Sequence, residues 1–478
     1  MRNYIVVDLG TGNSRVALVS SSGKIYTVKS FENTYYKDEQ YEDAQYFIPD
    51  EWQELIMGAC RAITGEFPDV KISAVTSAGA RESIVLADKE GKIFLGLPNI
   101  DNRGRKWIGD IPDKGYIYER TGRWVTEDFP AAKLLGLRKM HPDLYDRIGK
   151  ITSISEWIGD IFTGKMVIEP SQACETQLFD IETLEWSARL CAYFDMNQEL
   201  LPEIEKAGRS LGKIRQELCK SLMLPTDAEF IVGGADTQVA VKGSGIRTGD
   251  VAVVSGTTSP VVTIVENKYC DKEKRCWTDC NLKGDNYQVE TNPGVTGMNY
   301  QRFKKRFFAD ISYGELDRIM SEKEDFLCTA SFSSLYFSKR QSLKKGGFIT
   351  GAPFDGNFDM TDLLWALVGD IACSIYVQYE SLCEMIPHKK NYILGCGGGL
   401  QSKVLCQMIA DLTGRELIIH EGFEQASIFG CISLCNEYFG IPESGSRCQK
   451  LNFKPGSGSL IHRYYPIWMK NRQMLNPI

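Results

Sequence analysis

The sequence predicts an α/β protein of two related domains, with the active site in the cleft between them. Its first hundred residues alternate strand-like and helix-like segments, as layered α/β domains do. The plan of strand, Gly/Thr turn and strand occurs at residues 3–20 and again at 250–265. At 478 residues the chain is also too long for one ordinary core. Because sequence identity between the halves is low, the repeat is architectural, and we expect domains at 1–246 and 247–478.

Composition narrows the class of protein. The chain is 43% hydrophobic and 24% charged, which is ordinary for a globular protein. Its net charge of −7 argues against general nucleic-acid binding. Fifteen scattered cysteines suit a reducing cytosol, and the spacing of Cys270, Cys276 and Cys280 misses the paired rhythm of zinc sites. Asp8 interrupts the N-terminal apolar stretch too early for a secretory signal, and the uncharged run over residues 251–265 is too short to span a bilayer. We therefore expect a soluble cytoplasmic protein with no membrane or nucleic-acid partner.

The opening segment joins strands expected over residues 3–9, 14–20 and 24–31. Asp8 stands where the first strand meets solvent, and Gly10 and Gly12 follow it. Glycine permits backbone angles and close approaches that larger residues resist. Two interpretations stay open: a hairpin with a polar turn, or a loop whose N–H groups and hydroxyls cradle a phosphate.

The rest of the first half adds two candidate sites. A helix near residues 50–63 and a buried strand over 72–78 come first, and Arg81 and Glu82 follow them. These two side chains form either a surface ion pair or a polyol-binding pair that donates to and accepts from hydroxyls. Asp236 in "IVGGADTQ" stands where a strand opens into a helix, and is either a helix cap or an exposed, held carboxylate.

The second half repeats the design with a further glycine cluster. "DVAVVSGTTSPVVTIV" gives strand, polar turn and strand, and a long helix starts at residue 362. A strand at 392–394 then runs into four glycines among residues 395–399 and a helix over 401–413. Such a turn lets a ligand pack on backbone at a helix N-terminus. It is neither G-x-G-x-x-G, since Ser402 stands at the required third glycine, nor a Walker A loop.

Five motifs in order carry a family resemblance: "DLGTGNSR", "GGADTQ", "SGTTSP", "GCGGGLQSKVLCQMIADLTG" and "EQASIFGC". With them the chain resembles, over nearly its whole length, the FGGY family of carbohydrate kinases, which shares a superfamily with actin and the heat-shock ATPases. The resemblance implies two actin-like (ribonuclease H-like) domains. It also implies transfer of the γ-phosphate of ATP, with Mg²⁺, to a hydroxyl of a small sugar.

The resemblance assigns roles to matching positions. Asp236 would be the general base, and Asp8 would help place Mg²⁺ through water. The remaining ATP-binding positions are Thr11, Gly12, Ser14 and Arg15 in the first phosphate loop, Gly256 and Thr257 in the second, Gly398, Gly399 and Ser402 at the adenosine, and Gly297 and Gln301 in the nucleotide cleft.

The resemblance also bears on the substrate. In glycerol and autoinducer-2 kinases the Arg-Glu pair matching Arg81 and Glu82 lies in the substrate pocket. "NIDNRGR" and "SEWIGDIFTGK" resemble autoinducer-2 kinases more than xylulose kinases, and add Asp101, Arg103 and Glu156 as groups in or just behind the pocket. We therefore expect a small linear sugar or polyol, with an autoinducer-2-like hydroxylated pentanedione first and xylulose, ribulose, another ketose or glycerol as alternatives.

Two other classes of protein fit the sequence less well. A nucleotide-driven switch would need a peptide-binding domain, for which the chain leaves no room after the last motif. A sugar sensor without catalysis is disfavoured because Asp8 and Asp236 are both present. Gly136 and Gly369 replace the Trp and Glu that are common in the family signatures, which bears on the finer choice of substrate. Assembly as a homodimer is left open.

Overall fold

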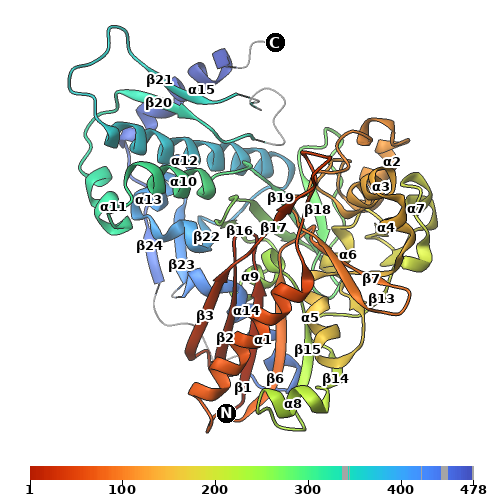
Figure 1. The fold of residues 1–478 in the computed structure, drawn as a ribbon. Coiled ribbons are helices and arrows are strands. Elements are labelled where there is room, and N and C mark those ends of the chain that lie inside the picture. Colours follow the sequence, from red (N-terminus) through yellow and green to blue (C-terminus); the bar gives the residue numbers. More distant parts are fainter. Residues whose placement is uncertain (336–342, 344, 421, 443–449, 476–478) are drawn as a thin grey trace.

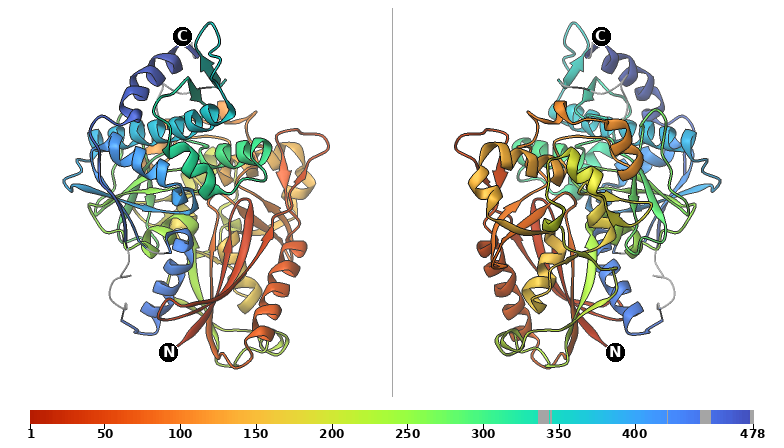
Figure 2. Two further views of the ribbon diagram at one scale, coloured as in Figure 1. Left: turned by 90° about the vertical axis from the view of Figure 1, so that its left-hand side faces the viewer. Right: turned by 90° about the vertical axis from the view of Figure 1, so that its right-hand side faces the viewer.

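The computed structural model describes residues 1–335, 343, 345–420, 422–442 and 450–475, and two large sheets organise them (Figure 1). The six-stranded sheet has the order β14-β15-β6-β1-β2-β3 and the seven-stranded sheet β18-β19-β17-β16-β22-β23-β24. We call these sheets, with the elements packed on them, the first and second lobes. The start of β1 and helix α15 lie at opposite ends of the molecule (Figure 2).

Three neighbouring strands of the first sheet end at the same level. Its strands are β1 (Asn3–Leu9), β2 (Asn13–Ser20), β3 (Ile25–Glu32), β6 (Ile72–Gly79), β14 (Ser210–Lys213) and β15 (Glu229–Ala235). β1 is antiparallel to β2 and parallel to β6, and β6 is parallel to β15. Leu9 and Ala235 both pair with Gly79 in register. The segments that carry Asp8, Arg81 and Asp236 therefore leave the sheet side by side.

The second sheet repeats this design. Its strands are β16 (Val251–Val254), β17 (Val261–Val265), β18 (Trp277–Cys280), β19 (Tyr287–Thr291), β22 (Tyr392–Cys396), β23 (Glu416–His420) and β24 (Lys450–Phe453). β16 is antiparallel to β17 and parallel to β22, as β1 is to β2 and β6. The expected architectural repeat of two α/β halves is confirmed. The ends of β16 and β22 bring the second Gly/Thr turn beside the glycine cluster.

Helices cover both sheets. They are α1 (Pro49–Glu66), α2 (Lys114–Thr121), α3 (Pro130–Met140), α4 (Pro142–Asp146), α5 (Ile154–Thr163), α6 (Pro170–Cys174), α7 (Ala188–Tyr193), α8 (Gln216–Ser221), α9 (Asp236–Gly243), α10 (Gly297–Phe307), α11 (Tyr313–Ser321), α12 (Met360–Met385), α13 (Lys403–Thr413), α14 (Ala426–Tyr438) and α15 (Leu460–Leu475). The sequence places Leu55 of α1 on one apolar face with Trp52, Ile56, Ala59 and Ile63, but Leu55 is 43% exposed, while Met57 and Cys60 are buried. The apolar stripe of α1 is thus rotated away from Leu55.

Smaller sheets complete the lobes. They pair β4 (Tyr36–Lys37) with β5 (Gln45–Tyr46), β7 (Ile84–Asp88) with β8 (Ile93–Leu97) and β9 (Ile148–Ser153), β10 (Val167–Ile168) with β13 (Glu203–Ile204), β11 (Phe179–Asp180) with β12 (Glu185–Trp186), and β20 (Cys328–Ser331) with β21 (Gly347–Thr350).

Two helices bear on the domain organisation. α14 lies beyond residue 246 in sequence, yet its Ile428 and Cys431 share a buried cluster with Tyr4 and Val6 of the first sheet. The chain thus crosses back to the first lobe near its end.

α12, which begins in a capping box made by Asp359, is the one described helix long and apolar enough to span a membrane. It is mostly buried and packs in the core of the second lobe.

Candidate functional site between the lobes

Asp8 is fixed by the first and last motifs of the chain together. Arg15 Nε and Nη2 approach Asp8 Oδ2 at 2.8 and 2.7 Å. The Ser427 hydroxyl, at the start of α14, donates to the same oxygen at 2.6 Å. Arg15 Nη1 also donates to Gln425 Oε1 at 2.8 Å. The aspartate is therefore a nearly buried carboxylate with fixed orientation at the tip of β1.

The turn after β1 has a closed inner side and an open tip. A Cβ on Gly10 would lie 2.8 Å from the Asn13 carbonyl oxygen, so the turn needs glycine there. Gly12 is exposed, and Thr11 Oγ1 accepts from Asn99 Nδ2 at 2.8 Å. The Ser14 hydroxyl is buried and donates to Asn33 at 2.7 Å. Thr11 and Gly12 thus lie toward the open side, while Ser14 braces the turn from behind.

Asp236 is the first residue of α9, and the cap position belongs to Ala235, which makes no side-chain cap bond. The helix-cap interpretation of Asp236 is therefore wrong. Its Oδ1 accepts from the Thr237 N–H at 2.6 Å. Burial raises the pKa of Asp236 to about 6; Arg81 opposes the rise, and the negative charges of Asp8 and Glu82 add to it. A carboxylate that titrates near neutrality suits general-base chemistry.

Arg81 is not part of a surface ion pair with Glu82. It is 9% exposed and binds Glu290 of β19 through both terminal nitrogens, at 2.7 and 3.2 Å. Glu82 has a positive φ of 59°, and its side chain is 14% exposed. The charges of both residues act on Asp236. The structure therefore brings Arg81, Glu82 and Asp236 together, and adds a partner from the second lobe that the sequence did not indicate.

Behind Arg81 lies a buried charge cluster that no sequence motif revealed. Arg123, which is fully buried, places Nη2 at 2.6 Å from Glu175 Oε1 and 2.7 Å from Asp279 Oδ1. Its guanidinium also lies 4.4 Å from the centre of the Trp277 ring. Arg81 Nη1 is 3.8 Å from Glu175 and 3.7 Å from Asp279. The available signal was a pair of acidic residues, Asp279 and Glu290, inside otherwise buried strands.

Burial and pairing set the charge of these groups. Burial raises the pKa of Glu175 well above its ordinary value, against the pull of Arg123. Burial likewise raises the pKa of Asp279 to about 6. For Glu290 burial acts in the same direction, but Arg81 outweighs it and holds the pKa below its ordinary value. Glu290 is therefore the member of the cluster that is firmly ionised.

Asp101 and Arg103 pair with each other. Arg103 Nε donates to Asp101 Oδ2 at 2.7 Å, and its Nη2 donates to the Gln45 carbonyl at 2.9 Å. Both side chains are buried. They fix the loop that carries Asn99, and through it the position of Thr11.

Glu156 is also a buried residue linked to the loop of Arg81 through hydrogen bonds. It is buried in α5, and burial raises its pKa to about 7. Ser153 donates to it, and Ser153 also bonds Ser155, which accepts from Gln172 Nε2 at 3.0 Å. The same Nε2 donates to the Gly79 carbonyl at 3.0 Å. Glu156 therefore supports the loop that carries Arg81.

Lys133 is a further supporting residue that sequence reasoning missed. Its ammonium is fully buried and donates to the carbonyls of Glu82 and Pro98 at 2.6 and 2.8 Å. Burial lowers its pKa to about 8. The lysine ties together the two loops that border the pocket.

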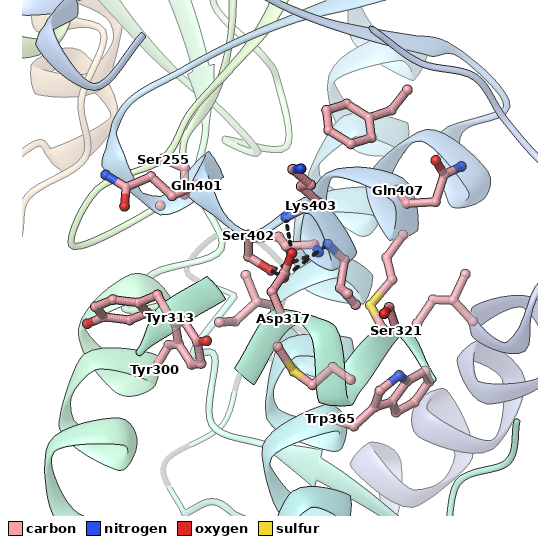
Figure 3. Close-up of a pocket in the computed structure, with 18 of the residues that line it drawn as sticks. Ser255, Tyr300, Tyr313, Asp317, Ser321, Trp365, Gln401, Ser402, Lys403 and Gln407 are labelled. Atoms are coloured by element: carbon pink, nitrogen blue, oxygen red, sulfur yellow. Dashed lines mark hydrogen bonds between the residues drawn. The ribbon is translucent and has the colours of Figure 1, made fainter. Parts of the chain in front are cut away.

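A separate cavity of about 870 Å³ opens in the second lobe (Figure 3). Its lining includes the five residues expected at the adenosine and the nucleotide cleft, namely Gly297, Gln301, Gly398, Gly399 and Ser402. Tyr300 and Tyr313 lie together on one side of it, at a ring-centroid distance of 5.7 Å (Figure 3). The cavity thus combines aromatic rings with backbone, as sites for flat ligands do.

The N-terminus of α13 at this cavity is already occupied by a carboxylate (Figure 3). Asp317 accepts from the Ser402 hydroxyl at 2.5 Å and from the Lys403 N–H at 2.9 Å. An incoming anion would meet like charge there. This end of the cavity therefore favours an uncharged part of a ligand, such as a nucleoside, over its phosphates.

Glycines join this cavity to the second Gly/Thr turn. A Cβ on Gly399 would lie 2.2 Å from Ser255 Oγ, and one on Gly397 would lie 2.3 Å from the Ser255 carbonyl oxygen. The Thr257 carbonyl accepts from the Met298 N–H at 3.3 Å, and Gly256 is exposed. The turn at Gly256 and Thr257 thus borders the cavity, in the second lobe.

Comparison with known proteins agrees with this geometry. The model of the FGGY family of carbohydrate kinases, N-terminal domain, matches residues 3–243. "Putative sugar kinase YoaC" of Bacillus subtilis (strain 168) is 39% identical over 99% of this chain and 98% of its own. A xylulose kinase of Lactococcus lactis is 25% identical, covering 98% and 96%, and an autoinducer-2 kinase of Salmonella choleraesuis 24%, covering 91% and 86%.

Solved structures agree on the fold. The ligand-bound xylulose kinase of Lactobacillus acidophilus superimposes with a TM-score of 0.84 at 19% identity, covering 99% of this chain and 98% of that one. The two lobes are thus the two actin-like domains expected from the sequence. The match of the family model and the 39% identity over the whole chain show that this protein belongs to the FGGY family of carbohydrate kinases and is an ATP-dependent sugar kinase.

Proposed function

We propose that the protein transfers the γ-phosphate of MgATP to a hydroxyl of a small linear sugar or polyol, with Asp236 as general base. One observation carries the proposal. A carboxylate whose pKa burial raises to about 6 stands where β15 opens into α9, within the influence of Arg81, Glu82 and Asp8. A base of this kind takes the proton of an attacking hydroxyl when it lies within hydrogen-bond reach.

The two Gly/Thr turns supply the rest of the arrangement. Phosphoryl transfer needs alignment and charge neutralisation more than covalent chemistry. Thr11 and Gly12 would contact the phosphates from the first lobe, and Gly256 and Thr257 from the second. Since each lobe holds one turn, the site is complete only when the lobes close, which also excludes water.

Asp8 fits a magnesium site through water. Carboxylate oxygen suits Mg²⁺, which keeps several of its own waters. Because Asp8 Oδ2 is already engaged by Arg15 and Ser427, direct ligation through that oxygen would displace these bonds. The ion, when bound, neutralises charge on the phosphates. Asp8 would orient its waters, and Arg15 would hold Asp8 in place.

For the substrate we place an autoinducer-2-like hydroxylated pentanedione first, and xylulose, ribulose or glycerol next. The autoinducer-2 and xylulose kinases match at 24% and 25% identity, so the relatives do not separate these choices. Assembly as a homodimer, a cytoplasmic location and a domain boundary near residue 246 belong to the same proposal.

The test is ATP consumption by the purified protein with magnesium, across polyols, ketoses and the autoinducer-2 precursor. Asp236→Asn should abolish turnover on the member that works. Asp227→Asn, an exposed aspartate with a 3.5 Å pair to Lys71, is the matched control and should leave turnover unchanged. Sugar binding without turnover would favour the non-catalytic sensor instead, and full turnover by Asp236→Asn would exclude Asp236 as the base.

A further inference from the structure

The guanidinium groups nearest the proposed substrate pocket are both bound to carboxylates. Arg81 pairs with Glu290, and Arg123 with Glu175 and Asp279. Together with Glu82, four carboxyl groups face two guanidinium groups. Within the described residues, Glu175 Oε2 has no hydrogen-bond partner, and neither have Arg123 Nε and Nη1. Asp279 is held by ion pairs alone, with Oδ1 at 2.7 Å from Arg123 Nη2 and Oδ2 at 3.7 Å from Arg81 Nη1. Carboxyl groups therefore outnumber guanidinium groups here, and the positive charge of each arginine is already paired with a carboxylate.

The contacts of Glu290 keep Arg81 in its carboxylate-bound state. It is fully buried on β19, and both of its oxygens meet the guanidinium in a fork-to-fork pair. Asn292 Nδ2 donates to Glu290 Oε1 at 2.9 Å and so fixes the carboxylate from its other side. Arg81 itself retains 9% exposure, whereas Glu290 has none. Arg81 can therefore contact a substrate only while its positive charge is paired with Glu290.

We propose that Glu290 is a specificity-determining residue, which restricts the pocket to uncharged polyols and ketoses by occupying the guanidinium of Arg81. This inference rests on the proposed kinase function and names its substrate class. An uncharged sugar can donate its hydroxyls to Glu82, whose side chain is 14% exposed, and accept from Arg81. A sugar acid would bring a further negative charge beside Glu82 and Glu290 and find no free cation, which disfavours it strongly.

The test compares matched pairs that differ in one terminal group: glycerol with glycerate, xylitol with xylonate, and glucitol with gluconate. For the full-length protein with MgATP, we expect kcat/KM for the acid of a working pair to be at least about 100-fold below that for its neutral partner. Equal or better turnover of the acid would overturn the inference, while the kinase function would stand.

Substitutions then test whether Glu290 itself sets the preference for neutral substrates. Glu290→Gln keeps the shape and frees the charge of Arg81, so the ratio of neutral to acid substrate should fall at least about tenfold. The double variant Arg81→Gln with Glu290→Gln removes the cation as well and should not accept the acid. Glu66→Gln, which removes an equal charge from an exposed pair with Lys29, should leave the ratio unchanged. An unchanged ratio in a folded Glu290→Gln protein would refute the role of Glu290.

Equilibrium binding separates this inference from the proposed function. Isothermal titration of the same pairs into the wild type needs no turnover. Binding of neutral members alone, without ATP consumption, would support the inference and remove the kinase proposal. Equal binding of neutral and acid members, or binding of neither together with no turnover, would overturn the inference.

Discussion

Asp236→Asn should make the folded protein more stable at neutral pH while it removes catalysis. Burial raises the pKa of Asp236 from 3.8 to about 6, so ionisation of this carboxyl lowers the free energy of unfolding. A group whose pKa is higher in the folded state favours folding at low pH and loses that contribution as the pH rises. At 1.36 kcal/mol for each pKa unit, the loss at pH 7.5 is about 3 kcal/mol. At pH 5, between the two pKa values, it is about 2 kcal/mol.

Asparagine has the same shape and no titration. Its advantage in free energy of unfolding should therefore reach up to about 3 kcal/mol at pH 7.5 and be smaller by about 1 kcal/mol at pH 5. The assay is urea unfolding followed by tryptophan fluorescence at both pH values, with Asp227→Asn as the exposed control. A variant less stable than the wild type at pH 7.5, or an advantage independent of pH, would refute the assignment of Asp236 as a desolvated carboxylate.

Three further predictions follow from the same geometry. Gly399→Ala places a methyl group 2.2 Å from Ser255 Oγ and should raise KM for ATP about tenfold or more, whereas Gly109→Ala, which meets open space, should leave it unchanged in steady-state kinetics. Arg123→Gln leaves two buried carboxyl groups without their cation and should lower the free energy of unfolding by about 3–5 kcal/mol, measured by urea unfolding; a loss below about 1 kcal/mol would contradict the cluster. Finally, kcat/KM should fall about tenfold for each pH unit below about 6 as Asp236 takes up a proton, and a flat profile between pH 5 and 7 would speak against it as the base.

The sequence predicted the elements that bear local signals. Apolar strands ending in Asp8 or in the turn at Gly256, and amphipathic helices such as α12 and α13, carry their pattern within a short window. The cavity lined by Gly398 and Ser402 was predicted for the same reason, since its glycines and its helix are contiguous.

The pairing of side chains across the lobes could not be predicted. Arg81 and Glu290 lie 209 residues apart, and nothing in either segment indicates the other. The same holds for Arg123 with Asp279. Contacts of this kind depend on how two separately folded sheets meet, which periodicity does not encode. Within the first lobe, Ser427 and Asp8 lie 419 residues apart, and their contact is equally unpredictable from either segment. The sequence thus singled out Asp236 and the charges that act on it, but not Glu290 of the second lobe, which holds Arg81.

Sugar-stimulated ADP formation, measured side by side for the wild type, Asp236→Asn and Asp227→Asn, tests the central claim most directly. The account predicts stimulation by at least one neutral polyol or ketose, a loss of about 10²–10⁴-fold in Asp236→Asn, and wild-type rates in Asp227→Asn. Stimulated turnover that survives intact in Asp236→Asn would contradict it.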